Sequence, residues 1–254
     1  MELLSVVVIT YNESKHIKRC LDSVQDIANE IIVVDSGSTD HTVAIAQSCG
    51  AKVIDRDWLG FGEQKNFANS LTKNNRILSL DADEALSSEL KEEISAALKK
   101  PDYEVYSMNR RNRYCGKWLR YSGWYPDAKP RLFNKEIACW NTNRVHETLE
   151  VAPNVAIGKF KFDLLHYPFD SIDEHKKRAE KYALLGAEQL FLKGKIPNFF
   201  KLHFGGFFRF FRDYVLKLGF LDGRPGFWAC KITAQAVSKK YAEAMRLFNQ
   251  GTGS

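Results

Sequence analysis

Two carboxylates separated by one residue follow directly after an apolar segment. The segment runs from Arg76 to Asp81, and Asp83 comes two residues later. Side chains two residues apart on an extended backbone point the same way, so Asp81 and Asp83 place two hard oxygen ligands together. Such a pair suits Mg²⁺ or Mn²⁺, which favour carboxylate and phosphate oxygens. The alternative is that Asp83 only caps the helix that follows.

Apolar segments that suit buried strands alternate with helical segments up to residue 81. The expected strands are residues 3–10, 30–35, 52–55 and 76–81. The first segment between them has apolar residues three to four positions apart, the spacing of a helix. This alternation predicts an α/β fold with a parallel sheet and right-handed crossovers.

Three of these strands end in side chains that can bind a polar ligand. Thr10 closes the first strand and precedes Tyr11 and Glu13. Asp35 closes the second strand, and Asp81 closes the fourth. Because ligands of such sheets bind beyond the carboxyl ends of strands, we expect these groups at one edge of the sheet.

Glycine motifs that bind phosphates are absent from the sequence. No Gly-x-Gly-x-x-Gly follows the first strand, and no Gly-Lys-Ser/Thr is present. A dinucleotide fold of the dehydrogenase kind and a P-loop are therefore disfavoured. A nucleotide bound here would need a metal for its phosphates.

Composition and charge describe a globular chain. Its 254 residues, 44% hydrophobic and 27% charged, can bury a full core in one large domain or a domain with an appendage. The net charge of +6 permits an anionic substrate, an anionic membrane surface or nucleic acid, and selects none of them. Five cysteines without a Cys-x-x-Cys indicate free thiols in a reducing compartment rather than a zinc site.

Targeting signals are also missing. Glu2 is acidic and the apolar stretch that follows has no basic leader, so no signal peptide is expected. No stretch reaches the roughly 20 uninterrupted apolar residues of a membrane span. We expect a cytoplasmic protein.

Three motifs in sequence order resemble the inverting family 2 glycosyltransferases with a GT-A fold. They are Val-Val-Ile-Thr-Tyr-Asn-Glu13, Ile-Val-Val-Asp35-Ser-Gly-Ser-Thr-Asp40 and Leu-Ser-Leu-Asp81-Ala-Asp83-Glu. Within that family, the chain and its Gly219-Phe-Leu-Asp-Gly223 motif look most like bacterial lipopolysaccharide-core glucosyltransferases. The resemblance implies a catalytic domain over residues 1–167, with a nucleotide-sugar-binding half (1–100) and an acceptor half (101–167). Residues 168–254 are expected to form a helical extension.

The resemblance also implies the reaction. A hexose, expected to be glucose, would move with inversion from a UDP-sugar to a hydroxyl of the lipopolysaccharide inner core, expected to be a heptose, or of another glycolipid. Asp35 with Thr10, Tyr11 and Glu13 would bind the uracil and ribose, assisted by Lys65. Asp83 and Asp81 would hold Mg²⁺ or Mn²⁺ on the diphosphate, which neutralises charge on the leaving group.

Three residues of the second half receive roles from the same resemblance. Glu147 matches the general base, although His146 precedes it where the family usually has an acid; it could instead be an ordinary strand-edge charge. His166 matches the late histidine that completes metal coordination, or it is a core histidine. Arg131, in a stiff basic loop, is expected to face the diphosphate or the acceptor, unless it is a surface arginine.

An aromatic and basic segment follows beyond residue 194. Residues 198–220 contain eight phenylalanines interleaved with lysine and arginine. This pattern fits a helix in the headgroup region of an anionic surface, here the cytoplasmic face of the inner membrane. Packing on the catalytic domain or in a dimer interface fits equally well, and the oligomeric state is open. Such segments also bind nucleic acid, but no nucleic-acid module is recognisable.

Two other function classes stay open from the residues alone. A sugar-phosphate nucleotidyltransferase could use a similar acidic site, although it usually has a glycine-rich basic loop after the first strand. A non-catalytic protein that binds a sugar nucleotide or a membrane is the other alternative.

Overall fold

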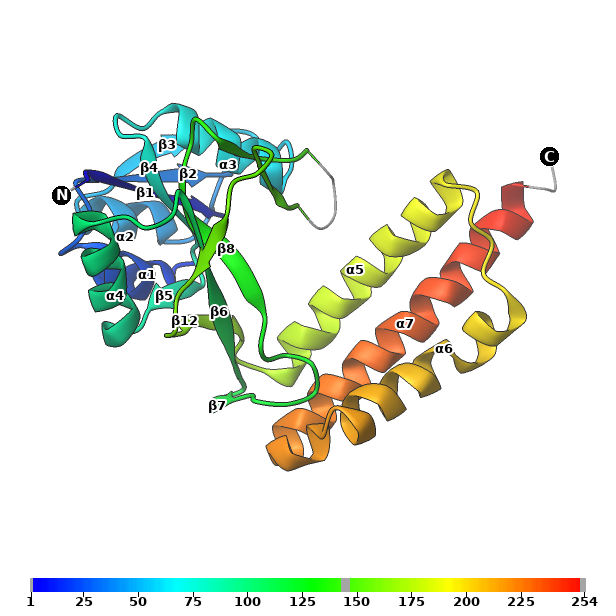
Figure 1. Cartoon of the computed structure of the whole chain (residues 1–254). Coiled ribbons are helices and arrows are strands. Elements are labelled where there is room, and N and C mark those ends of the chain that lie inside the picture. Colours follow the sequence, from blue (N-terminus) through cyan, green and yellow to red (C-terminus); the bar gives the residue numbers. More distant parts are fainter. Residues whose placement is uncertain (1, 143–146, 252–254) are drawn as a thin grey trace. The chain divides into compact units, whose positions relative to one another are not determined.

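The computed structural model describes residues 2–142 and 147–251, and the chain forms two compact units. The first unit comprises residues up to 110 together with 127–167, and the second comprises 111–126 together with 168 onward. Segment 111–126, which the sequence-based division assigned to the acceptor half, therefore groups with the C-terminal helices. Figure 1 shows the elements of both units.

Four parallel strands form one half of the sheet in the first unit, in the order β3-β2-β1-β4 (Figure 1). The two central strands, β1 and β4, are almost completely buried, as expected for strands with both faces covered, whereas the edge strand β3 is not. The predicted parallel sheet is confirmed. The strands are β1 (Leu4–Thr10), β2 (Glu30–Asp35), β3 (Lys52–Asp55) and β4 (Arg76–Asp81).

Helices cover both faces of these strands. Successive side chains of a strand point to opposite faces, so Val6 and Val8 of β1 pack with three helices while Val7 and Ile9 pack with the fourth, α3. The three helices on the first face are α1 (Ile17–Val24), α2 (Thr42–Ser48) and α4 (Ser88–Lys99), and α3 spans Phe61–Ser70.

The rest of the first unit extends the sheet by antiparallel pairing. The order continues β4-β8-β6-β12-β5, with β8 antiparallel to both β4 and β6. Strand β11 instead pairs parallel with β6, and the complete sheet is mixed. Its further strands are β5 (Glu84–Leu86), β6 (Val105–Tyr114), β8 (Ala128–Asn134), β11 (Ile157–Lys159) and β12 (Leu164–Phe169); β9 (Ala138–Trp140) and β10 (Leu149–Val151) pair separately.

Strand register brings the carboxyl ends together. Thr10 lies beside Asp35, and Ile9 lies beside Asp81. Strand β5 follows directly after Asp83, and Ser87 caps α4 by accepting a hydrogen bond from the Leu90 N–H at 3.2 Å. Asp83 is therefore not a helix cap, which leaves its carboxylate for another role.

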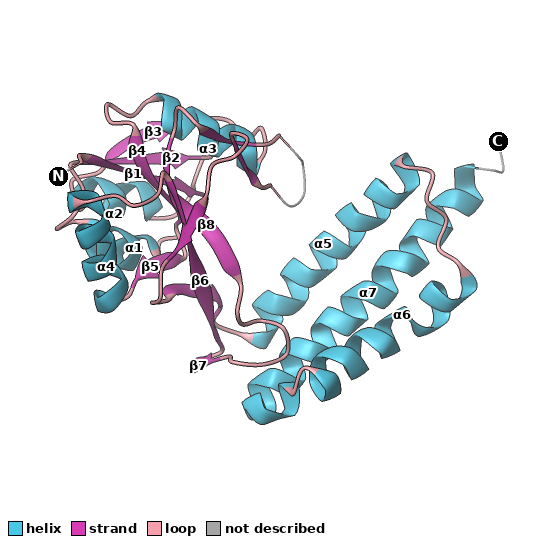
Figure 2. Cartoon of the chain, in the orientation of Figure 1, coloured by secondary structure: helices cyan, strands magenta, loops and turns pink. Residues whose placement is uncertain are grey.

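Three helices dominate the second unit (Figure 2). Helix α7 (Gly223–Gly251) packs against both α5 (Ile172–Leu192) and α6 (Phe199–Phe211). A capping box begins α5, with Ser171 and Glu174 each accepting from the other's backbone N–H. A π-helix (Arg212–Leu216) and a 3₁₀-helix (Gly219–Asp222) connect α6 to α7.

Strand β6 ends inside the second unit, where β7 (Lys117–Trp118) pairs with it. Tyr114, Leu119, Phe169 and Ala229 form a small buried core there. No helix within residues 2–142 and 147–251 is both long enough and apolar enough to cross a membrane.

Candidate functional site

The loops after β1 and β2 are joined by hydrogen bonds. The buried Asp35 carboxylate accepts from the Ser38 backbone N–H (2.7 Å) and hydroxyl (2.5 Å). Asn12 has a positive φ of 54° and accepts from the Thr39 N–H at 2.8 Å, while its own N–H donates to the Ser38 hydroxyl at 2.7 Å. The sheet edge beside Asp35 is thus a rigid platform made of two loops.

Thr10 and Tyr11 lie at this platform. Thr10 is buried, and its hydroxyl has no hydrogen-bond partner within the described part of the chain. The Tyr11 side chain is 56% exposed. The Glu13 backbone N–H donates to the Thr42 hydroxyl at 2.8 Å. Tyr11 therefore offers an aromatic ring to a ligand at the edge of the sheet, whereas the Thr10 hydroxyl is enclosed.

Asp81 belongs to a buried network of charges. The Arg131 Nη2 donates to Asp81 Oδ2 and to Glu84 Oε1, both at 2.6 Å. Glu84 also accepts from the Asp81 backbone N–H at 3.0 Å. The Lys65 Nζ lies 3.0 Å from the other oxygen, Asp81 Oδ1, in an ion pair without good hydrogen-bond geometry. Each carboxylate oxygen of Asp81 therefore faces a cation.

The network fixes the charges of its members. Burial alone would raise the pKa of Asp81, but Arg131 and Lys65 outweigh it and hold that pKa well below the usual range. Burial would lower the pKa of Arg131, while Asp81 and Glu84 raise it well above its ordinary value. The Asp81 carboxylate is therefore ionised at neutral pH.

Lys65 connects this network to the predicted base. Its Nζ lies 3.0 Å from Glu147 Oε1 as well as from Asp81 Oδ1, and 4.5 Å from the centroid of the Trp140 ring. Lys65 is fully buried, because α3 carries it beneath β9. One ammonium group therefore holds two carboxylates that lie far apart in the sequence.

Asp83 and His166 form a second pair at the same strand end. The His166 Nε2 lies 3.3 Å from Asp83 Oδ2, and the two side chains are only slightly exposed. Antiparallel pairing of β12 with β5 sets this distance, since it places His166 opposite Glu84 and lets the Tyr167 N–H donate to the Asp83 carbonyl at 2.9 Å.

The donor set suits a hard divalent cation. Mg²⁺ is usually bound by one or two protein carboxylates, with substrate phosphates and water completing its shell. Asp83 supplies a carboxylate of that kind, and the His166 imidazole lies beside it. No group of three or more His, Cys, Asp or Glu side chains within the described ranges could hold a metal by itself. Asp81, predicted as a further ligand, has its oxygens engaged by Arg131 and Lys65.

Two charged residues of the site were missed at the level of sequence. Glu84 is fully buried, and Arg110 donates to it at 3.2 Å and to Asp127 at 2.8 Å. The position of Glu84 directly after Asp83 was the available signal. Arg131 was expected to face the diphosphate or the acceptor; the structure places its guanidinium in the buried network. His146 lies outside the described residues.

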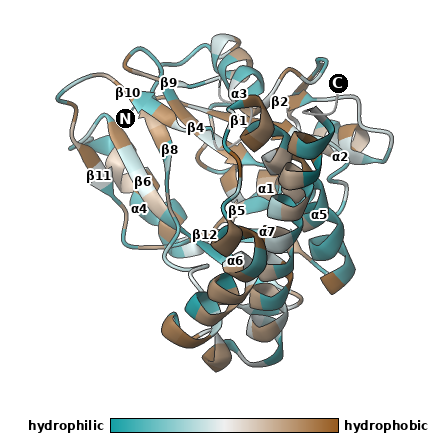
Figure 3. Ribbon diagram, turned by 90° about the vertical axis from the view of Figure 1, so that its right-hand side faces the viewer, coloured by the Kyte–Doolittle hydropathy of each residue, from teal (hydrophilic) through white to brown (hydrophobic). Residues whose placement is uncertain are grey.

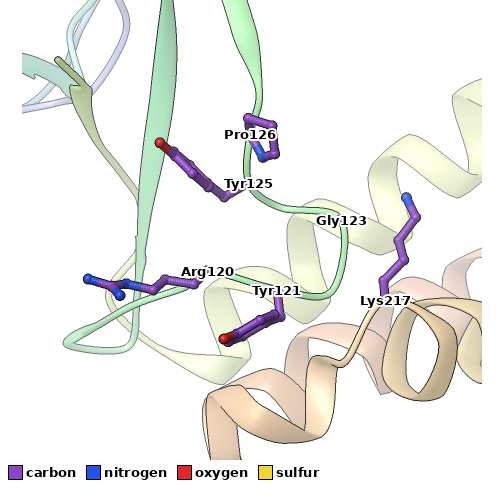
Figure 4. A pocket seen from close by; sticks show the side chains of 6 residues that line it. All are labelled: Arg120, Tyr121, Gly123, Tyr125, Pro126 and Lys217. Atoms are coloured by element: carbon purple, nitrogen blue, oxygen red, sulfur yellow. The ribbon is translucent and has the colours of Figure 1, made fainter. Parts of the chain in front are cut away.

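A separate hollow of about 330 Å³ lies in the second unit (Figure 4). In Figure 4 Lys217 lies beside Gly123, and Tyr121 and Tyr125 leave the same loop. None of the residues predicted from the sequence lines it. Its lining consists of Arg120, Tyr121, Gly123, Tyr125, Pro126 and Lys217.

Several known proteins are similar to this chain in sequence or in structure. A glycosyltransferase of Rickettsia bellii is 33% identical over 96% of this chain and 86% of that protein. The lipopolysaccharide core biosynthesis glycosyltransferase LpsC of Rhizobium meliloti is 30% identical over 91% of this chain and 84% of that protein. Glucosyl-3-phosphoglycerate synthase of Mycobacterium tuberculosis, solved with Mn²⁺ and UDP, is 24% identical over 43% of this chain and 44% of that one, with a TM-score of 0.38.

The sequence profile of Glycosyl transferase family 2 matches residues 5–153, which is more than half of the chain and includes the three strand-end motifs. Together with the full-length relatives, this match shows that the chain belongs to glycosyl transferase family 2 and is a glycosyltransferase with the α/β GT-A fold.

Proposed function

We propose that this glycosyltransferase moves a hexose from a UDP-sugar to a hydroxyl group of a glycolipid, with inversion at the anomeric carbon. The observation that carries the proposal is the Lys65 ammonium, which lies 3.0 Å from both Asp81 and Glu147. It places the predicted base next to the strand end where the donor diphosphate would lie. Membership in a glycosyltransferase family decides against the nucleotidyltransferase and the non-catalytic alternatives.

The donor nucleotide would occupy the platform after β1 and β2. Asp35, held by Ser38, would contact the uracil and ribose, with Thr10 beside it. Tyr11 and Glu13 would border the same ligand, since they follow Thr10 in the loop. Of this set, Tyr11 is the most exposed and the most free to adapt to a nucleotide.

Asp83 and His166 would hold Mg²⁺ or Mn²⁺, which supplies charge neutralisation at the diphosphate leaving group when bound. We assign Asp81 a supporting role, because Arg131 and Lys65 already occupy its oxygens. Its ionised carboxylate keeps these two buried cations in place beside the diphosphate.

Glu147 would act as the general base. Its carboxylate takes the proton of the acceptor hydroxyl while that oxygen bonds to the anomeric carbon. The bond between that carbon and the diphosphate oxygen breaks on the opposite face, and UDP leaves with its electron pair. Lys65 orients Glu147 for this transfer through the 3.0 Å contact to Oε1.

The name of one relative supports the proposed acceptor class. A relative that matches most of this chain is named as a lipopolysaccharide core enzyme. We therefore propose glucose as the donor sugar, a heptose of the lipopolysaccharide inner core as the acceptor, and peripheral attachment to the cytoplasmic face of the inner membrane.

Replacement of Glu147 by Gln tests the assignment. We expect kcat to fall by about 10²–10⁴, because general-base catalysis usually contributes that much, with the KM for UDP-glucose unchanged. Release of UDP in the presence of Mn²⁺ and acceptor is the measurement. Glu150→Gln, a matched change in the neighbouring strand β10, should behave like the parent protein. A Glu147→Gln enzyme with near-normal kcat would remove the base role from Glu147.

A further inference from the structure

Helix α6 carries six exposed phenylalanines, which we call the aromatic face. Their side chains are between 42% and 69% exposed, and Figure 3 shows hydrophobic colour along this helix. A surface helix of a soluble domain normally turns such side chains toward its core, so their exposure needs a reason. The aromatic face consists of Phe199, Phe200, Phe204, Phe207, Phe208 and Phe211.

The opposite side of α6 packs on α7. A Cβ on Gly206 would lie 2.0 Å from the Ser238 hydroxyl oxygen, and one on Gly205 would lie 2.9 Å from the Tyr241 ring. These two glycines therefore bring α6 against α7 at close range. At about 100° per residue, the aromatic face spans about half of the helix circumference, away from that contact.

The charges around the aromatic face have one sign. Residues 193–217 contain six lysines and arginines and a single acid, Asp213. That acid is buried and neutralised by Arg209 and Arg212, both of which donate to it. Lys201 and Arg212 fall just beyond one edge of the aromatic face and are exposed. The surroundings of the face are therefore basic.

We propose that the aromatic face of α6 lies in the headgroup region of an anionic lipid bilayer, with the helix parallel to the membrane plane. Helices that bind in this way combine an apolar face with flanking cations. His203, the one polar residue within the face, contacts the Phe199 ring at 4.4 Å between centroids. The phenylalanines would bury apolar surface while Lys201 and Arg212 contact lipid phosphates.

Charge decides between a bilayer and a second copy of the chain. A two-fold interface places the same patch on both subunits, so the cations of one copy would meet those of the other. Like charges brought together in this way are strongly unfavourable. An anionic surface is complementary to the same patch. The inference rests on the proposed function only in so far as a glycolipid acceptor brings the enzyme to a membrane.

Vesicle co-sedimentation of the full chain tests the surface. We expect binding to phosphatidylcholine vesicles that contain phosphatidylglycerol and much weaker binding to phosphatidylcholine alone. Phe207→Ser should weaken binding about tenfold, from the apolar area that it no longer buries. Leu59→Ser is the matched control, because Leu59 is exposed to the same degree (62% against 64%) but lies in the first unit. It should bind like the parent.

A second pair of variants tests the contribution of the cations to vesicle binding. Lys201→Gln should weaken binding to the anionic vesicles about fivefold, whereas Lys100→Gln, exposed at the end of α4, should not. Equal binding by Phe207→Ser and the parent, or no vesicle binding by the parent, would overturn the proposal. A dimer that depends on α6, observed by sedimentation, would also overturn it. Binding of single-stranded RNA through the aromatic face, without binding of vesicles, would do the same. Glu147→Gln should bind vesicles like the parent protein. Failure of the proposed reaction and failure of the proposed membrane binding are therefore distinguishable.

Discussion

Removal of the Arg131 charge should strongly destabilise the first unit, because this side chain is buried and ion-paired. The guanidinium contacts Asp81 and Glu84 at 2.6 Å each and is almost fully buried. Arg131→Met keeps much of the side-chain volume and removes the charge. Two buried carboxylates would then share only the cations Lys65 and Arg110.

The expected cost is about 3–5 kcal/mol, the usual result of removing one partner of a buried ion pair. This free energy corresponds to a roughly 10²- to 5 × 10³-fold faster exchange of backbone amides that open with the network. Native-state hydrogen exchange at the amides of β4, which carries Asp81, measures it directly.

Lys129 provides a matched control, because it lies two residues from Arg131 on the same strand, β8. Lys129→Met removes the same charge, but the Lys129 side chain is 40% exposed and pairs with Asp127 at 3.1 Å. Exposed pairs contribute at most about 1 kcal/mol, so exchange in β4 should change less than tenfold. Equal effects of Arg131→Met and Lys129→Met would refute the conclusion that burial of the network determines its energy.

The same variant has a pH signature. In the parent, the depressed pKa of Asp81 contributes stability above the unfolded-state pKa, and this stability is lost as pH falls. Without Arg131 the pKa of Asp81 rises, so the variant loses less stability on acidification. The difference in opening free energy between parent and variant should therefore narrow as the pH falls below about 4, the ordinary pKa of an aspartate. A difference that widens would contradict the assigned cause.

Two further outcomes are expected. Gly62→Ala, at the start of α3, should destabilise the first unit by about 1–3 kcal/mol by overpacking, because its Cβ would lie 1.8 Å from the Asn141 carbonyl oxygen. An unchanged midpoint of thermal unfolding would contradict this expectation and show that the backbone at Asn141 moves aside. Burial, with help from Arg178, lowers the pKa of His175 to about 4, so the unfolded state takes up its proton first and stability should fall by about 2 kcal/mol from pH 7 to 5. That loss should be absent in His175→Gln, as measured by thermal unfolding at both pH values.

Local sequence patterns determined the first half of the fold. Nearly continuous apolar segments, each closed by a polar residue, predicted strands β1 to β4, and the structure confirms them. Strands joined by crossover connections in a parallel sheet all run in the same direction. Because the carboxyl ends of such strands meet at one edge, the sequence alone predicts that Thr10, Asp35 and Asp81 lie together, as they do in the structure.

Sequence patterns were less informative after Asp83. Short strands with many turns can pair in several ways, so the contact of β12 with β5 that places His166 beside Asp83 could not be derived from local rules. The grouping of segment 111–126 with the C-terminal helices also depends on long-range packing.

Residue types by themselves determined that carboxylates, an imidazole and a lysine would be available to a donor diphosphate. Tertiary structure alone decided which charges touch. Burial makes an unpaired charge costly, so the fold brings Arg131 to Asp81 and Glu84, and Lys65 to Glu147, across gaps of 47 to 82 residues. No local rule encodes such contacts, because they follow from how separate segments fill the same low-dielectric interior.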